Sequence, residues 1–175
     1  DGFRTSHEIS KIDVIPDDVI RAMIPEDKVM EHKHRSLDPD HPVVRGTSQN
    51  PDVFFQAREA ANTYYEKVPG LVQEVMDEFY DHTGRRDNLF DYVGQPEADR
   101  VSIILGSGDG AVWEAMEKRV GDGAPRGALF VRRFRPVSIE HFIDKMPKTV
   151  KQIAVLDRTK EPGSIGEPLY MDIQS

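Results

Sequence analysis

Short apolar runs alternate with helical stripes through the second half of the chain. Residues 129–134 are rich in β-favouring side chains and predict a strand. Residues 153–156 form a continuous apolar run, which is typical of a strand covered on both faces. Two strands joined by a helix in so few residues predict parallel pairing with a right-handed crossover. The apolar stripe of that helix consists of Ile139, Phe142, Ile143 and Met146.

Turn and cap residues mark the ends of these elements. Pro136 ends the first strand, because proline cannot donate to a strand ladder. Ser138 then stands at an N-cap position, where its hydroxyl can accept from the first amides of the helix. Pro147 stops the helix. The crossover therefore has local signals at both ends.

Two more strands and a helix precede this crossover. Residues 88–93 indicate one of these strands, and residues 101–105 indicate the other, which is expected to be buried. A glycine loop at 106–110 follows, and a helix is predicted from 111 to 120. The fold class predicted is α/β, with an open, mostly parallel sheet flanked by helices and preceded by a helical and irregular linker arm.

The first part of the chain is polar and broken by prolines. Residues 37–51 form a connector, because they combine prolines and Gly46 with a run of turn formers. We place the domain boundary there, with residues 1–50 as an arm and residues 51–175 as the α/β domain. Helices are predicted at 16–23, 26–36, 50–66 and 69–82.

Aromatic residues and a glycine give further expectations for the two longer helices, the first at 50–66 and the second at 69–82. Phe54 and Tyr64 recur at helical spacing on the first, and we expect them to pack in a core. Gly84 is placed to end the second helix in a left-handed conformation.

Composition narrows the functional classes. The 175 residues carry 31 acidic and 23 basic side chains, and this net charge of −8 disfavours nucleic acid as a partner. The chain has no cysteine, which excludes disulfides, a thiol nucleophile and iron–sulfur ligation by these residues. No apolar run approaches the roughly 20 residues of a membrane span. We expect a cytoplasmic protein without a membrane partner.

Three neighbouring arginines form the sharpest basic cluster in this acidic chain. In a strand, Arg133 and Arg135 would project to one side and Arg132 to the other. The cluster could bind a phosphate or a partner's carboxylate. Salt bridges to the chain's own acids, or a contact between domains, are the alternatives.

A second candidate is the loop at 157–166, which follows a strand. Ligands of open α/β sheets collect at the carboxyl ends of strands. Arg158 and Lys160 supply positive charge there, and Gly163 and Gly166 permit unusual backbone angles. An anion site, an interdomain contact and a purely structural loop all remain open.

The remaining motifs are weak. The loop at 106–110 fits the dinucleotide fingerprint poorly because residue 111 is alanine, and a tight turn is the alternative. His32 and His34 lie two residues apart, so they do not share a helical face and are a poor metal pair. No catalytic set and no metal site is predicted.

Five runs in the chain are long or unusual in composition. They are DGFRTSHE at 1–8, HPVVRGTSQNPDVFFQAREAANTYY at 41–65, LFDYVG at 89–94, RRFRPVSIEHF at 132–142 and KTVKQIAVLDRTKEPGSIGEPLY at 148–170. Together they resemble pyruvate:ferredoxin (flavodoxin) oxidoreductase, and the resemblance spans nearly the whole chain. One departure is the glycine-rich loop GSGDGAVWEA.

The resemblance implies a large enzyme that converts pyruvate and coenzyme A to acetyl-CoA, carbon dioxide and reduced ferredoxin or flavodoxin. It implies thiamine diphosphate, magnesium and [4Fe–4S] clusters for the full enzyme, held outside this segment. Residues 1–50 would be the tail of its pyrimidine-binding domain, and residues 51–175 a domain similar to the C-terminal domain of transketolases. The full enzyme would be a homodimer that meets its electron acceptor through other domains.

We therefore expect a piece of a longer polypeptide, in agreement with a first residue that is Asp1. Its role would be structural, as a scaffold and interface for the other domains, and alone it would be inactive. One alternative is a stand-alone module that binds an anion or nucleotide at the loop at 106–110 or at the loop at 157–166. The other is the same domain of an NADP-coupled or other 2-oxoacid oxidoreductase.

Overall fold

The computed structural model describes residues 2, 6–7, 9, 11–44, 46, 48–119 and 123–175. They form two compact units, one of residues 11–86 and one of residues 87–175 together with the first ten. This division into two units does not test the predicted domain boundary at residue 50, which stays a prediction.

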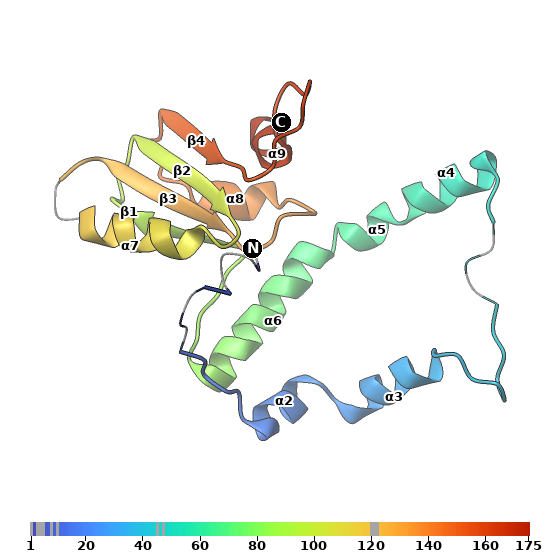
Figure 1. The fold of residues 1–175 in the computed structure, drawn as a ribbon. Coiled ribbons are helices and arrows are strands. Elements are labelled where there is room, and N and C mark those ends of the chain that lie inside the picture. Colours follow the sequence, from blue (N-terminus) through green and yellow to red (C-terminus); the bar gives the residue numbers. More distant parts are fainter. Residues whose placement is uncertain are drawn as a thin grey trace. The chain divides into compact units, whose positions relative to one another are not determined.

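The first unit is helical. Its helices are α2 (Asp17–Met23), α3 (Glu26–His34), α4 (Pro51–Ala60), α5 (Asn62–Tyr65) and α6 (Val68–Thr83) (Figure 1). Helices α2 and α3 each begin after a proline and carry acids in the first turn, where the helix dipole favours negative charge. Gly84 has a φ of 72° and ends α6, as predicted. Within the unit, α2 and α5 contact α6.

The aromatic residues of α4 and α5 do not form the predicted core. Phe54 is 51% exposed and Tyr64 is 75% exposed. Among described residues 11–86, Pro69 is the single buried one. The helical period was predicted correctly, but it does not show whether another layer packs on the stripe.

The second unit is built on a four-stranded sheet with the order β1-β3-β2-β4. β2, β3 and β4 are parallel, and β1 pairs with β3 antiparallel. The predicted open, mostly parallel α/β sheet is therefore confirmed. The strands are β1 (Phe90–Gly94), β2 (Arg100–Leu105), β3 (Arg126–Val131) and β4 (Gln152–Leu156).

Helices cover both faces of this sheet. α7 (Asp109–Arg119) and α8 (Ile139–Lys145) lie on opposite faces (Figure 1). This is what two right-handed crossovers require when one runs from β2 to β3 and the other runs back across the sheet from β3 to β4. Trp113 of α7 packs against Phe130, with ring centroids 5.2 Å apart. On the other face, Phe142 of α8 meets Phe90 edge-on at 5.6 Å.

The ends of α8 and the last helix follow local signals. Ser138 is the N-cap of α8, and its hydroxyl accepts from the His141 amide, as predicted. α9 (Pro168–Gln174) begins with a proline in its first turn. Among the described residues, no helix is both long and apolar enough to cross a membrane.

Two predictions about burial were wrong. β4 is the edge strand, and Ile153 and Leu156 are 46% and 47% exposed, although their run suggested a strand covered on both faces. The α8 stripe is also split, because Phe142 faces the sheet while Ile139 and Ile143 are 67% and 63% exposed. Apolar composition signals that a residue is to be covered, but not which part of a molecule covers it.

The boundaries of β3 also differ from the prediction. The strand begins at Arg126 and ends at Val131, three residues earlier than expected. The three arginines therefore lie in the loop after the strand, and the predicted strand-like alternation of their side chains was wrong. Pairing with β1 and β2 explains the shift, because Gly127 lies opposite both Gly94 of β1 and Val101 of β2, which brings the glycine segment into the ladder.

Candidate functional site

Two of the predicted loops leave the same edge of the sheet. β2 and β4 are parallel neighbours, so the loops that follow Leu105 and Leu156 emerge side by side. A hollow of about 290 Å³ lies between them. Ser107 and Gly108 line one wall, and Arg158 lines the other. This is where open α/β sheets place their ligands.

The wall made by the β2–α7 loop is a tight turn. Gly106 has a φ of 90°, and its carbonyl accepts from the Asp109 amide at 3.1 Å. A Cβ at Gly108 would lie 2.8 Å from the Cδ1 of Ile104. The glycines are therefore explained by the turn and by its packing on the strand.

Charge at this turn is already balanced within the protein. Arg132 Nη1 donates to Asp109 Oδ2 at 2.9 Å, and Arg132 Nε donates to Asp91 Oδ2 at 3.0 Å. Burial lowers the pKa of Arg132, but the hydrogen bond to Asp91 and the nearby carboxylate charges outweigh it, so the pKa is raised overall. Arg132 thus ties β1, the β3 end and α7 together.

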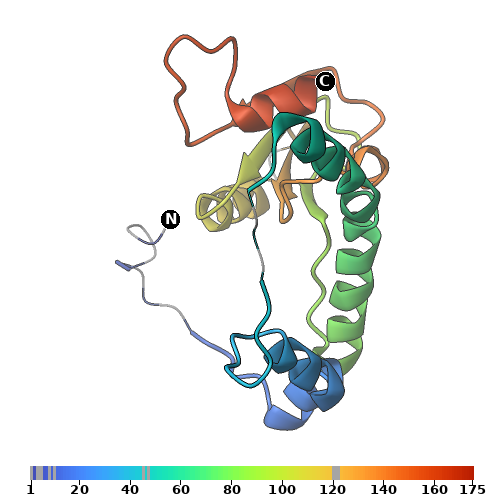
Figure 2. The ribbon, with the colours of Figure 1, turned by 90° about the vertical axis from the view of Figure 1, so that its right-hand side faces the viewer.

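The opposite wall begins a long loop that closes on itself (Figure 2). Asp157 Oδ2 accepts from the backbone amide of Leu169 at 2.8 Å, and its Oδ1 accepts from the Thr159 amide at 3.2 Å. Asp157 therefore caps the first turn of α9 from twelve residues away. Its carboxylate satisfies a helix-start amide that would otherwise lack an intrahelical partner.

The rest of the loop is held by Glu167. Its Oε2 accepts from the Glu161 amide at 2.7 Å, and its Oε1 accepts from Lys160 Nζ at 3.0 Å. Gly163 has a φ of 82°, and a Cβ at Gly166 would lie 2.5 Å from the Tyr170 ring. Lys160, Gly163 and Gly166 thus have structural roles in the loop.

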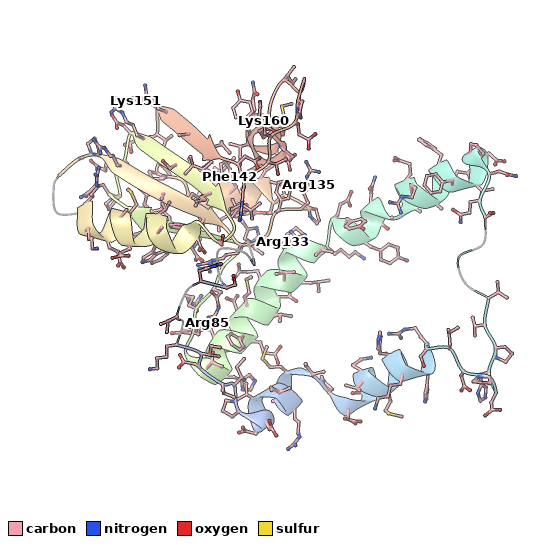
Figure 3. The ribbon with its side chains drawn as sticks, in the orientation of Figure 1. Arg85, Arg133, Arg135, Phe142, Lys151 and Lys160 are labelled. Atoms are coloured by element: carbon pink, nitrogen blue, oxygen red, sulfur yellow. The ribbon has the colours of Figure 1, made fainter. Side chains whose placement is uncertain are left out.

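Arg133 and Arg135 belong to the β3–α8 connection, outside the hollow (Figure 3). Arg135 is held by Asp172, and that hydrogen bond raises the pKa of Arg135. Arg133 Nη1 donates to the Pro136 carbonyl, and its Nη2 is buried without a hydrogen-bond partner in the described part of the chain. Burial lowers the pKa of Arg133.

The structure therefore separates the six predicted residues. Arg158 lines the hollow, Lys160, Gly163 and Gly166 build its loop, and Arg133 and Arg135 lie elsewhere. No group of three or more His, Cys, Asp or Glu side chains gathers as a metal site in the described ranges. A larger hollow of about 680 Å³ lies in the connector between Arg35 and Val43, along an exposed turn without such a group.

Sequence reasoning missed the residues that organise this edge. Asp157, Glu167 and Asp172 stand at ordinary surface positions, and their partners are six to thirty-seven residues away in the chain. The one available signal was Asp157, an acid directly after a strand and before a glycine loop. Spacing alone does not pair it with α9.

The chain is similar to segments of several known oxidoreductases. Residues 1–77 match the family model described as pyruvate flavodoxin/ferredoxin oxidoreductase, thiamine diphosphate-binding. Pyruvate-flavodoxin oxidoreductase of Nostoc sp. is 53% identical over 99% of this chain and 14% of its own length. Pyruvate:ferredoxin oxidoreductase of Moorella thermoacetica is 51% identical over 100% of this chain and 15% of its own length.

Two further matches mark the range of the similarity. The mitochondrial pyruvate dehydrogenase [NADP(+)] of Euglena gracilis is 45% identical over 100% of this chain and 10% of its own length. A solved 2-oxoglutarate:ferredoxin oxidoreductase of Magnetococcus marinus is 18% identical, with a TM-score of 0.43, over 74% of this chain and 19% of that one.

Each of these sequence relatives covers 99% or 100% of this chain. The match with the Nostoc enzyme covers 99% of this chain, but this chain spans only 14% of the length of that enzyme. The runs singled out in the sequence lie within this matched span. The chain therefore belongs to the pyruvate:ferredoxin (flavodoxin) oxidoreductase family, as the counterpart of one segment of those enzymes.

Proposed function

We propose that the chain is a non-catalytic scaffold and interface segment of a thiamine diphosphate-dependent pyruvate oxidoreductase that reduces ferredoxin or flavodoxin. In the full enzyme, pyruvate and coenzyme A yield acetyl-CoA and carbon dioxide. The observation that carries the proposal is the 53% identity to a pyruvate-flavodoxin oxidoreductase over 99% of this chain.

Exposed apolar side chains support the interface role. Ile139 and Ile143 form an exposed pair on α8, and Ile153 and Leu156 lie exposed on the edge strand β4. Large apolar side chains grouped on rigid elements mark surfaces that another part of a protein covers. The Nostoc enzyme is about seven times as long as this segment. We therefore propose that other domains of the same polypeptide cover these apolar side chains.

The polar edge of the sheet supports the non-catalytic role. Asp157 and Glu167 are occupied as hydrogen-bond acceptors within their own loop, and Asp109 is held by Arg132. A general acid or base must instead reach a substrate proton. We therefore assign these loops a structural role, and we assign the catalytic groups to other domains of the enzyme.

Thiamine diphosphate fits poorly to the described residues alone. A bound diphosphate with magnesium needs convergent oxygen ligands, and the described ranges contain no such group. In this proposal the segment takes no part in the chemical steps, and other domains hold the cofactor, its metal and the iron–sulfur clusters. The match of residues 1–77 to a thiamine diphosphate-binding family model fits a position beside that site.

Two measurements test the proposal. In the full-length oxidoreductase that carries this sequence, I143E should lower both the yield of assembled enzyme and pyruvate-dependent ferredoxin reduction. E140Q, on the same helix, should leave both unchanged. The isolated 175-residue chain, supplied with thiamine diphosphate, magnesium and coenzyme A, should not turn over pyruvate. Turnover by the isolated chain would refute the non-catalytic assignment.

The NADP-coupled enzyme is the second candidate, favoured by the 45% identity to the Euglena gracilis protein. The same segment is shared by relatives named for different electron acceptors, which is what a segment without acceptor contacts would show. Sequencing the remainder of the coding region separates the two candidates, because an NADP-coupled enzyme needs a module that binds NADP.

A further inference from the structure

A row of hydrogen-bond donors crosses the sheet where the parallel strands β2, β3 and β4 begin. This end of the sheet is opposite the end from which the loops described above emerge. Arg126 of β3 is in register with Arg100 of β2, and Arg100 is in register with Gln152 of β4. Residues in register on parallel strands point to the same face. The two guanidinium groups and the amide therefore stand on one face of three neighbouring strands.

The next row on that face is made of small residues. Ala128, Ser102 and Ala154 are in register two positions further along the strands. Because these side chains are short, a hollow of about 410 Å³ remains, and Met116 of α7 borders it. The donor row forms the rim of this hollow, and Ser102 lies within its lining.

Neither arginine is neutralised by another residue that the structure describes. Among the described residues, no hydrogen bond or ion pair involves the guanidinium of Arg100 or that of Arg126, although the chain has an excess of acids. Like charges side by side on neighbouring strands destabilise a sheet. Lys151, directly before β4, adds a third cation at the same edge (Figure 3). An anion bound between them would relieve this repulsion.

We propose that the hollow rimmed by Arg100, Arg126 and Gln152 binds the phosphate group of a phosphorylated small molecule. The fork of an arginine side chain matches phosphate oxygens with two hydrogen bonds, and two such forks with an amide and a hydroxyl suit a phosphate or diphosphate. Met116 offers an apolar wall to the rest of the ligand. The site is independent of pyruvate chemistry and of the scaffold role.

Titration of the 175-residue chain with inorganic pyrophosphate tests the site, with binding measured by calorimetry and by ³¹P NMR. R100Q and R126Q should each weaken pyrophosphate binding by about 10-fold or more, because each removes a charge-assisted pair. Q152A, which changes an exposed side chain, should weaken it less. R35Q is the matched control in the other compact unit and should bind as the unchanged chain does.

ADP distinguishes two sources of the same phosphate chemistry. Binding of ADP more tightly than pyrophosphate would support a nucleotide ligand, and equal affinities would support a free or sugar-linked phosphate. A thermal unfolding midpoint equal to that of the unchanged chain shows that each variant is folded. Absence of pyrophosphate binding at millimolar concentration, or undiminished binding by folded R100Q and R126Q, would overturn the proposal.

Discussion

Arg135 and Asp172 form a two-point ion pair between the segment after β3 and helix α9. The Nε–Oδ2 distance is 2.7 Å, and the Nη2–Oδ1 distance is 2.8 Å. The guanidinium carbon also lies 4.7 Å from the centre of the Phe134 ring. The pair fixes the C-terminal helix to the sheet unit, and it occupies an arginine that the sequence offered as an anion site.

Separating Arg135 from Asp172 should loosen α9. R135Q and D172N should each lower the free energy of unfolding. The double variant should lower it by less than the sum of the two, because both single changes break the same bidentate pair. Urea unfolding of the four proteins of this double-mutant cycle measures the coupling, and repeating it in high salt should reduce that coupling. A coupling of zero in low salt would show that the pair contributes nothing.

Removing the Asp157 carboxylate should release the start of α9. D157A should lower the free energy of unfolding by about 1 kcal/mol, the typical value for loss of a helix-capping acceptor. Amide hydrogen exchange should accelerate at Leu169, which donates to this carboxylate. D157N keeps one oxygen acceptor and is the matched control, so it should show a smaller effect. Equal exchange rates in D157A and the unchanged chain would contradict the capping role.

Gly94 and Gly70 should respond oppositely to alanine. Gly94 has a φ of 138°, and an added Cβ would lie 2.4 Å from the Gly127 Cα and 2.5 Å from the Arg126 carbonyl oxygen. G94A should cost roughly 3 kcal/mol or more, because backbone atoms of β3 must move and the backbone is strained. Gly70 lies in helix α6 with open space around it, so G70A should stabilise by about 0.5–1 kcal/mol. Chemical denaturation measures both changes, and a neutral G94A would contradict the close approach of β1 and β3.

Tyr92 should make the fold sensitive to alkaline pH. Burial raises the pKa of Tyr92 above its ordinary value of 10.0, and its hydroxyl donates to the Gln95 carbonyl at 2.6 Å. The unfolded chain therefore loses this proton first as the pH rises. The contribution of Tyr92 to stability is complete below the ordinary pKa and is lost as the pH rises through the folded pKa.

The unfolding midpoint in urea, followed from neutral pH to about pH 11, measures this loss. Y92F cannot ionise, so its midpoint should fall less steeply over the alkaline range, although its stability at neutral pH is lower by one hydrogen bond. Identical slopes for Y92F and the unchanged chain would contradict the assignment.

Local signals located the elements because their causes are local. Gly84 ends α6 and Ser138 caps α8, and in each case the conformation depends on the residue itself and its near neighbours. The order of strands and helices then limited the sheet to a mostly parallel arrangement. β3 was displaced because residues 126–128 have no apolar run, and their pairing with neighbouring strands β1 and β2 makes them part of a strand.

The site was less accessible to sequence reasoning. The rule that ligands of open α/β sheets collect at the carboxyl ends of strands singled out the loop after β4, but only the structure brought it beside the loop after β2. The partners of Asp157 and Arg135 were not predicted either, because α9 is brought to these side chains only by the folded loop. The exposed side chains of Ile143 and Ile153 could not be foreseen either, because periodicity indicates an apolar face but not its cover.

The sequence by itself determined the family, the α/β class and the helix ends, because these depend on residue identity at short range. The tertiary structure alone decided which charges meet. It paired Arg135 with Asp172 and left Arg100 beside Arg126, since strand register and loop closure set distances that no spacing along the chain encodes.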